Sequence, residues 1–216
     1  MIARVARFRF PSQQHREEAE RNGGGRVGPA IARAPGFHAL YFGRTGTLEG
    51  VSISLFENRE ANEAAGAAMN ATPLLPGQVS EMLPTPESVE FHDVLSSLVR
   101  DQAPEVGRFG RLTLSPGQSE DDADRWGRET FAPMLKGVAG LCQGYLLRGS
   151  EEGERIALTF WASADAMRRG GEAIGEWQAR EIAAGRTPGL MGADADILTD
   201  LRVLAVAVPS TMPAPA

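Results

Sequence analysis

The chain has 216 residues, of which 42% are hydrophobic and 23% charged, enough apolar material for the core of a globular protein. Its formal net charge of −6, with acidic and basic residues mixed along the chain, excludes a surface built mainly for nucleic acid or an anionic membrane. The single cysteine, Cys142, excludes an internal disulfide framework, a four-cysteine zinc site and a CxxC redox motif.

The start of the chain predicts a cytoplasmic protein. Arginines interrupt the first residues every few positions, so there is no apolar stretch of the kind that a signal peptide needs. No segment approaches the roughly 18 consecutive apolar residues of a membrane-spanning helix. We therefore expect neither a membrane nor a nucleic acid as a partner.

The first half of the chain alternates between strand and helix patterns. The predicted elements are, in chain order, a strand over 4–10, a helix over 12–22, strands over 37–43 and 51–56, a helix over 59–70 and a strand over 89–97. Ser12 and Asn58 precede the two helices and are residue types that cap helix N-termini. The turn at Pro35-Gly36 introduces the central hairpin.

The second half repeats this order. Its predicted elements include a strand over 108–115, a helix over 119–136, a hairpin, a helix over 164–177 with Ser163 as its cap, and a strand over 201–208. A shift of 104 residues pairs ten identical residues over positions 4 to 44, among them Arg7 with Arg111 and Tyr41 with Tyr145. After one extra residue in a turn, the shift becomes 105.

The order β-α-β-β-α-β, found twice, predicts an α+β fold of two tandem ferredoxin-like repeats. The repeats would cover 1–103 and 104–208, followed by a proline-rich flexible tail over 209–216. An antiparallel sheet with both helices on one face leaves its other face uncovered, so we expect the two sheets to pack face to face. They would close a barrel with a small inner chamber, in a chain that is a monomeric pseudo-dimer or a weak homo-oligomer.

Short motifs carry a family resemblance. They are 33–37 (RAPGF) before a strand, 54–58 (SLFEN) before a helix, and their counterparts 138–141 (VAGL) and 159–163 (TFWAS). With these motifs the chain resembles the antibiotic biosynthesis monooxygenase-like family of the dimeric α+β barrel superfamily, over residues 1–208 in two copies. Members are usually single-repeat chains that pair as homodimers, so this chain resembles a fused pair.

The resemblance implies a chemistry that needs no cofactor. Activities in the superfamily include oxygenation of quinol-like or anthrone-like polyketides, haem degradation and lactone isomerisation. Haem degradation is disfavoured because Gly66 and Gly171 stand where the haem-degrading members carry a histidine ligand. Three scattered histidines offer no metal-ligand spacing, so we expect neither a cofactor nor a metal.

Cofactor-free oxygenation requires a base, groups that hold the resulting anion, and a chamber that excludes water. His38 and His92 are the candidate bases because histidine titrates near neutrality. Arg7 and Arg111, identical between the halves, are the candidate anion holders. The alternative is that both histidines make ordinary strand hydrogen bonds and that the arginines form salt bridges at the rim of the barrel.

The candidate substrate contacts come from strand alternation, which we expect to turn Val51, Ile53 and Leu55 toward the helices. The opposite faces would then line the chamber with Ser54, Phe56, Thr159 and Trp161, with Arg7, Phe109 and Arg111, and with His38, Leu40 and Phe42. Tyr41 and Tyr145 are further candidate contacts because they recur at equivalent positions. Core packing is the alternative for the aromatic residues.

A glycine-rich segment matches the dinucleotide fingerprint GxGxxG at Gly23, Gly25 and Gly28. It follows a polar helical pattern instead of a strand and ends at Pro29, which argues against nucleotide binding. We interpret it as a flexible loop.

The sequence thus predicts a monooxygenase-like enzyme that binds a small aromatic, quinol-type or polyketide-type molecule inside the barrel. One alternative is a small-molecule-binding or accessory protein of the same fold without catalysis. Another is an isomerase or cyclase that consumes no oxygen.

Overall fold

The computed structural model describes residues 1–71, 84–186 and 190–206, and eight strands of this part close into one barrel. The strands are β1 (Ile2–Arg9), β2 (Phe37–Arg44), β3 (Glu49–Phe56), β4 (Ser88–Val99), β5 (Val106–Leu114), β6 (Leu141–Arg148), β7 (Glu154–Trp161) and β8 (Leu190–Val206). The predicted tail over 209–216 lies outside the described residues.

The barrel is closed by pairing between the two halves of the chain. Its strand order is β1-β3-β2-β8-β5-β7-β6-β4, and every pair of neighbours is antiparallel. Strand β4 leaves the first sheet to pair with β6, while β8 leaves the second sheet to pair with β2. The predicted α+β fold, with two antiparallel ferredoxin-like sheets that pack face to face, is confirmed.

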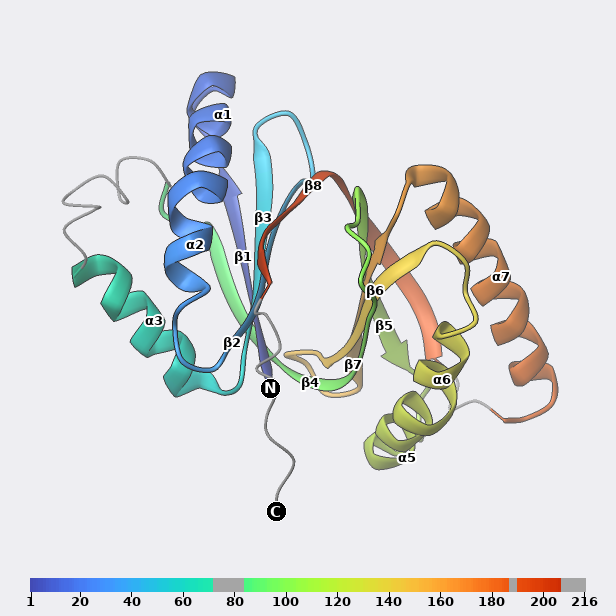
Figure 1. The fold of residues 1–216 in the computed structure, drawn as a ribbon. Helices are drawn as coiled ribbons and strands as arrows, with labels where there is room; N and C mark the ends of the chain where they lie inside the picture. Colours follow the sequence, from blue (N-terminus) through green and yellow to red (C-terminus); the bar gives the residue numbers. More distant parts are fainter. Residues whose placement is uncertain (72–83, 187–189, 207–216) are drawn as a thin grey trace, which may run out of the picture.

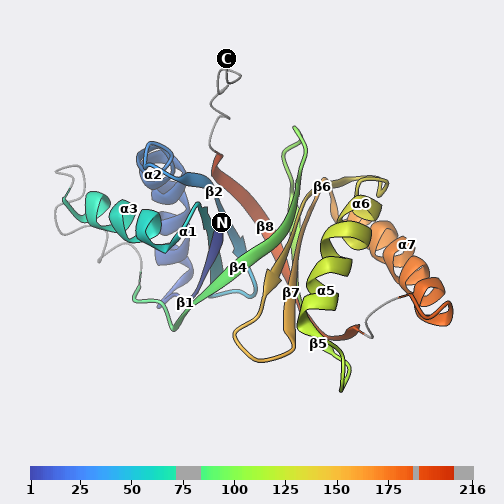
Figure 2. The ribbon, with the colours of Figure 1, turned by 90° about the horizontal axis from the view of Figure 1, so that it is seen from below.

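The helices cover the outside of the barrel in two groups (Figures 1 and 2). They are α1 (Gln13–Asn22), α2 (Gly28–Ile31) and α3 (Arg59–Ala71) on one side, and α5 (Glu120–Trp126), α6 (Ala132–Leu135) and α7 (Ala164–Ala183) on the opposite side. One face of each sheet therefore packs against helices, and the other face packs against the second sheet.

Side-chain caps begin the helices where the sequence predicts them. The backbone N–H of His15 donates to Ser12 Oγ over 3.2 Å, and Asn58 and Ser163 accept equivalent bonds. The last two elements are longer than predicted, since α7 runs to Ala183 and β8 starts at Leu190.

The glycine-rich segment is helical, so the loop prediction is wrong. Gly23–Val27 forms a π-helical turn that joins α1 to α2, and Gly127–Phe131 does the same between α5 and α6. Pro29 fits because a proline in the first turn of a helix lacks only an N–H that has no intrahelical partner. At Gly127 the absent side chain matters, because a Cβ there would overlap Leu146.

Apolar side chains from all eight strands meet inside the barrel. Val94 and Val203 pack against a buried cluster made of Ala3, Val5, Ala39, Tyr41, Val51, Ile53, Leu55, Phe109, Tyr145, Leu147, Ile156, Leu158, Phe160, Leu198 and Leu201. Three further apolar clusters lie between the strands and the helices. Both faces of β2, β3, β6 and β7 are consequently buried over most of their length, whereas β4 is partly exposed.

Helix α7 lies so close to β7 that one of its positions admits only glycine. A Cβ at Gly170 would overlap the ring of Trp161, which is 2% exposed and cannot move aside. We expect Gly170→Ala to lower the free energy of unfolding by about 1–3 kcal/mol, measured by urea denaturation. Gly175→Ala is the control, because nothing lies within 4 Å of a Cβ there and the helix gains propensity. Equal stability of both variants would contradict the close packing.

Each half anchors its first helix to its second strand with a buried carboxylate. Glu20 of α1 binds the guanidinium of Arg44 at 2.6 Å, and Asp124 of α5 binds that of Arg148 at 2.5 Å. Both carboxylates are 3–4% exposed, and the shift of 104 residues relates the two pairs. Asp124 also binds Arg155, whose side chain is only 1% exposed, at 2.7 Å.

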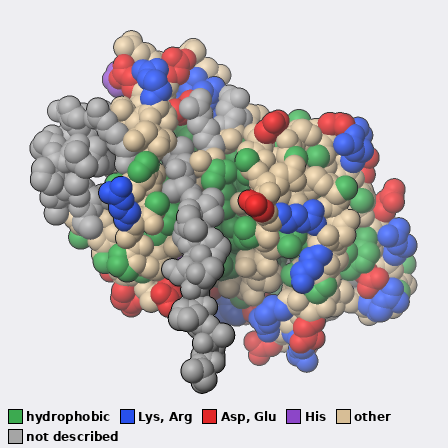
Figure 3. Space-filling view, in the orientation of Figure 1, with side chains coloured by type: hydrophobic (Ala, Val, Ile, Leu, Met, Phe, Trp, Pro, Cys, Tyr) green, Lys and Arg blue, Asp and Glu red, His purple; other side chains and the backbone are tan. Residues whose placement is uncertain are grey.

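The surface carries acidic and basic side chains close together on the face shown in Figure 3. Several are paired along one helix, as Asp165 is with Arg168 and Arg169 in α7. Among the described residues, no helix combines the length and the apolar character needed to cross a membrane.

Candidate functional site

A pocket of about 1170 Å³ opens at one end of the barrel, where β1 and β2 begin. Residues from both halves line it: Met1, Phe37, His38, Ala39, Tyr41, Leu55, Ser97, Val99, Arg100, Asp101, Gln102, Ala103, Pro104, Gln143, Tyr145 and Val203. This volume is large enough for a small aromatic molecule, and most of the lining side chains are apolar or aromatic.

Two tyrosines form the buried wall of the pocket. Tyr41 and Tyr145 are 1% and 5% exposed, and their hydroxyl oxygens lie 2.9 Å apart. Tyr41 stacks on Phe160 with ring centroids 4.4 Å apart, which fixes its ring. Burial raises the pKa of both hydroxyls, so each keeps its proton at neutral pH.

The tyrosine pair can donate one hydrogen bond to a bound molecule. One hydroxyl donates to the other, and neither makes a further hydrogen bond within the described residues. The second hydroxyl proton is therefore available to an acceptor atom of a molecule in the pocket.

His38 lies where the pocket meets solvent. Its side chain is exposed, and a register shift in β2 between Phe37 and Ala39 sets it beside the pocket. Such a bulge redirects side chains along a strand. The described residues make no hydrogen bond or ion pair to its imidazole ring, so the ring nitrogens can act on a bound molecule.

Arg100 is the arginine in the pocket lining, and the protein already engages its guanidinium. It donates to the backbone carbonyls of Val138 at 3.1 Å, Leu135 at 3.3 Å and Lys136 at 2.6 Å. These carbonyls belong to the end of α6 and the turn after it, so this positive charge is directed toward the helix layer.

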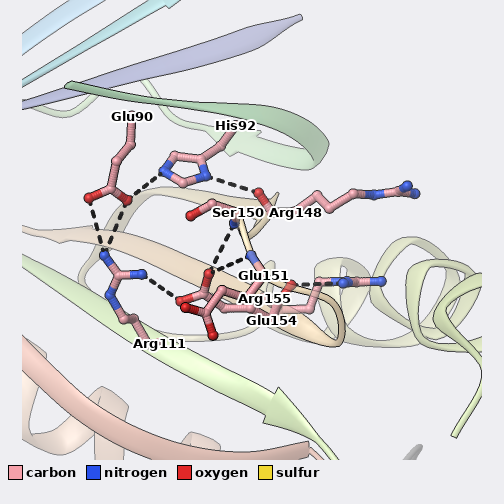
Figure 4. Close-up of polar contacts among 8 residues, drawn as sticks. All are labelled: Glu90, His92, Arg111, Arg148, Ser150, Glu151, Glu154 and Arg155. Atoms are coloured by element: carbon pink, nitrogen blue, oxygen red, sulfur yellow. Dashed lines mark hydrogen bonds and ion pairs between the residues drawn. The ribbon is translucent and has the colours of Figure 1, made fainter.

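The other predicted catalytic residues form an ionic cluster elsewhere in the barrel (Figure 4). Arg111 binds Glu154 at 2.5 Å and Glu90 at 3.2 Å, and Glu90 lies 3.3 Å from Nε2 of His92. Nδ1 of His92 donates to the carbonyl oxygen of Arg148 at 3.1 Å. His92 is 2% exposed, so this cluster is closed to solvent at the histidine.

Arg7 and Arg111 meet around one aromatic ring. Their guanidinium carbons lie 5.2 and 5.5 Å from the ring centroid of Phe109, within the range of cation–π attraction. Burial favours the neutral form of Glu154, but hydrogen bonding and attraction from Arg111 outweigh it and lower the pKa of this carboxyl. Burial also opposes the charge of Arg111, yet Glu154 and Glu90 raise its pKa. These charges compensate one another.

The strand register places Arg7 away from the pocket. Ile2 pairs with Phe56 at the end of β1 that is nearer the pocket, whereas Arg7 pairs with Val51 five residues farther along β1. The pocket lining contains one member of the predicted catalytic set His38, His92, Arg7 and Arg111, namely His38. The structure thus brings Arg7, Arg111 and His92 into one cluster and leaves His38 apart from them.

Four predicted chamber residues, Ser54, Phe56, Thr159 and Trp161, lie on the helix side of the barrel. Phe56 packs edge to face on Phe37, with ring centroids 5.5 Å apart, in the apolar cluster between the strands and helices α2 and α3. Trp161 contacts the α7 layer and donates from Nε1 to Oγ1 of Thr159 at 3.0 Å. Ser54 shares the face of Phe56 because side chains alternate along β3. The predicted facing of these residues is wrong.

The physical reason is the composition of the interior. Val51, Ile53 and Leu55 fill the inside of the barrel, so the more polar face of β3 turns to the helices. Leu40 and Phe42 also face the helices, contrary to the prediction. Strands β1 and β5 do present the predicted faces, with Phe109 inside.

Sequence reasoning missed Gln143 and the segment Arg100–Pro104, which complete the pocket. Gln143 is a polar residue within an otherwise apolar strand, and the shift of 104 residues aligns it with Ala39, which also lines the pocket. The glutamine in the second half, at a position where the first half has an alanine, was the sequence signal that could have identified Gln143 as a pocket residue.

No protein-family profile matches the sequence, and no curated protein matches it. Solved structures, in contrast, do match this chain. A "putative monooxygenase" from Lactobacillus acidophilus NCFM superimposes with a TM-score of 0.66 and 12% identity, over 95% of this chain and 97% of that chain. Another from Fusobacterium nucleatum gives a TM-score of 0.61 and 11% identity, over 96% and 94%. This chain therefore shares its fold, an eight-stranded barrel, with these two proteins described as putative monooxygenases.

A third similar structure is described as an anthrone oxidase-like protein, with a TM-score of 0.51 and 14% identity over 100% of this chain and 96% of that chain. At these identities the comparisons establish a shared fold and no activity. Within the described residues, no three potential metal ligands come together.

Proposed function

We propose that the protein is a cofactor-independent monooxygenase-like enzyme that acts on a small aromatic molecule, of quinol or polyketide type, bound in the pocket. The observation that carries the proposal is that, among the described residues, one largely apolar pocket holds an imidazole with no protein partner and a tyrosine proton with no acceptor. A base and a hydrogen-bond donor around an aromatic ring are what carbanion formation requires.

The chemistry follows from these two groups. His38 removes a proton from an activated ring methylene, and the anion delocalises over the aromatic ring system, an oxygen substituent of which accepts the tyrosine proton in a hydrogen bond. The carbanion reduces dioxygen, a carbon–oxygen bond forms, and the peroxide takes up the proton. Loss of water then leaves a ketone, so that the methylene compound and one O₂ give the ketone and one H₂O.

The described neighbours support this choice of substrate class. The name of the anthrone oxidase-like protein points to tricyclic aromatic ketones whose central methylene is acidic. A pocket of about 1170 Å³ accommodates such a molecule.

The test is oxygen uptake by the wild-type protein with 1,8-dihydroxyanthrone, in the presence of a chelator and without added flavin. We expect enzyme-dependent uptake of one O₂ for each anthraquinone formed, measured with an oxygen electrode and by absorbance. Uptake no faster than autoxidation in buffer, for this and for a naphthoquinol, would contradict the proposal.

A second candidate is a small-molecule-binding or accessory protein without catalysis, and the ionic cluster favours it. Arg111 and His92 already have protein partners, so they do not complete a catalytic group with His38. Saturable binding without turnover would identify this case. An isomerase or cyclase would instead form product without consuming oxygen.

A further inference from the structure

We propose that Gln143 is a specificity-determining residue that selects ligands with a hydroxyl group on the aromatic ring, and that it binds this hydroxyl together with the Tyr41 and Tyr145 pair. The inference rests on the proposed function for the location of the ligand. It goes beyond it by assigning the chemical group that the buried end of the pocket recognises.

The first observation is an amide that has no partner among the described residues. Gln143 lines the pocket, is 4% exposed, and its carbonyl oxygen Oε1 is fully buried and accepts no hydrogen bond from the part of the chain that the structure describes. Within the described residues, its NH₂ group has no hydrogen-bond partner either. Leaving a buried polar group unsatisfied is costly, so its presence in a cavity wall points to a bound partner.

The second observation is its position beside the tyrosines. Gln143 and Tyr145 are two residues apart on β6 and both line the pocket, which places their Cα atoms roughly 6.5–7 Å apart along one face of the strand. The pocket wall therefore offers an acceptor, Oε1, next to a donor, the spare tyrosine proton.

A phenolic hydroxyl matches this pair of groups. Its proton donates to Oε1 of Gln143, and its oxygen accepts from the tyrosine. A methyl ether can only accept and leaves Oε1 unsatisfied, whereas a carboxylate brings a charge that nothing at this wall compensates. The guanidinium of Arg100 is directed to backbone carbonyls, and Arg7 and Arg111 lie outside the lining.

Gln143 and His38 act on different positions of the ligand. The hydroxyl at Gln143 keeps its proton, because that proton is the donor to Oε1. Removal of a proton takes place at another position of the ligand, which His38 reaches from the exposed side of the pocket. The ligand class is thus a planar ring system with a hydroxyl at one end and an acidic C–H or O–H away from it.

The test compares two probes that differ only in this donor, 2-naphthol and 2-methoxynaphthalene, by fluorescence titration at pH 7. We expect the wild-type protein to bind 2-naphthol about tenfold more tightly than the ether, as one buried hydrogen bond allows. Gln143→Leu is expected to abolish this preference. Gln13→Leu, the same change at an exposed amide on α1, is expected to retain it.

Equal affinity of the wild-type protein for the two probes, or no binding of 2-naphthol, overturns the inference. So does a preference that survives in Gln143→Leu. Gln143→Met provides a second variant of similar volume if the leucine variant fails to fold, as judged by circular dichroism. A naphthol preference without oxygen uptake would sustain this inference and refute the proposed oxygenation, and oxygen uptake without the preference would do the reverse.

Discussion

Asp124→Ala is expected to lower the free energy of unfolding by about 3–5 kcal/mol, because it leaves a buried arginine without its main counter-ion. Asp124 is 4% exposed and binds Arg155 through Oδ1 at 2.7 Å and Arg148 through Oδ2 at 2.5 Å. Arg148 is 43% exposed and can return to solvent, whereas Arg155 is 1% exposed and cannot. The closest remaining carboxylate to Arg155 is that of Glu120, at 3.5 Å.

The control for this variant is Asp165→Ala. Asp165 also binds two arginines, Arg168 and Arg169, but all three side chains are more than half exposed. Solvent screens such pairs, so we expect little change in stability. Urea denaturation of both variants measures the difference. Equal losses would show that burial of Asp124 contributes nothing.

A second substitution separates the two causes of the loss. In Asp124→Ala combined with Arg155→Met, the unpaired guanidinium is gone and an apolar side chain takes its place. We expect the double variant to be more stable than Asp124→Ala alone. If it is less stable, the loss comes from missing contacts of Asp124 and not from the orphaned charge of Arg155.

The sequence contained most of the fold, because the relevant signals are local. Caps such as Ser12 and Ser163 mark where helices begin, and the turn residues mark the hairpins. The shift of 104 residues then related the two halves and gave the element order. The length of β8 was underestimated because it pairs with β5 of one half and β2 of the other, contacts that are distant in sequence. Helix α7 also runs farther than its local pattern predicts, to Ala183.

The faces of β2, β3 and β7 could not be obtained in the same way. In a barrel covered by helices both faces of a strand are buried, so the alternation of Val51, Ile53 and Leu55 with smaller residues does not say which face is inside. The space available inside the barrel decides which face points inward, and this space depends on all eight strands together.

The β-bulges that shape the candidate site could not be predicted from the sequence either. Register shifts at Phe37/Ala39 in β2, at Val94/Ser96 in β4 and at Leu141/Gln143 in β6 change which side chains enter the pocket. Such bulges are properties of strand pairing and leave no single-sequence pattern. This is why His38 could be proposed from residue type but its separation from Arg7 and Arg111 could not.

His38→Ala is expected to reduce enzyme-dependent oxygen uptake with 1,8-dihydroxyanthrone by about 10²–10⁴-fold, the usual contribution of a general base. Of the two predicted bases, His38 lines the pocket, while His92 holds the carbonyl oxygen of Arg148 and lies beside Glu90. The change removes an exposed side chain, so the free energy of unfolding should stay close to that of the wild type.

The control is His15→Ala on α1, since His15 is exposed and bound to Ser12, away from the pocket. We expect its oxygen uptake to equal that of the wild type. If the base is His38, the residual rate of His38→Ala should rise with added imidazole, because the missing group can be supplied from solution at the exposed side of the pocket. Full activity in His38→Ala would remove His38 as the base and leave the ionic cluster around His92 as the place to search, since the described histidines are His15, His38 and His92.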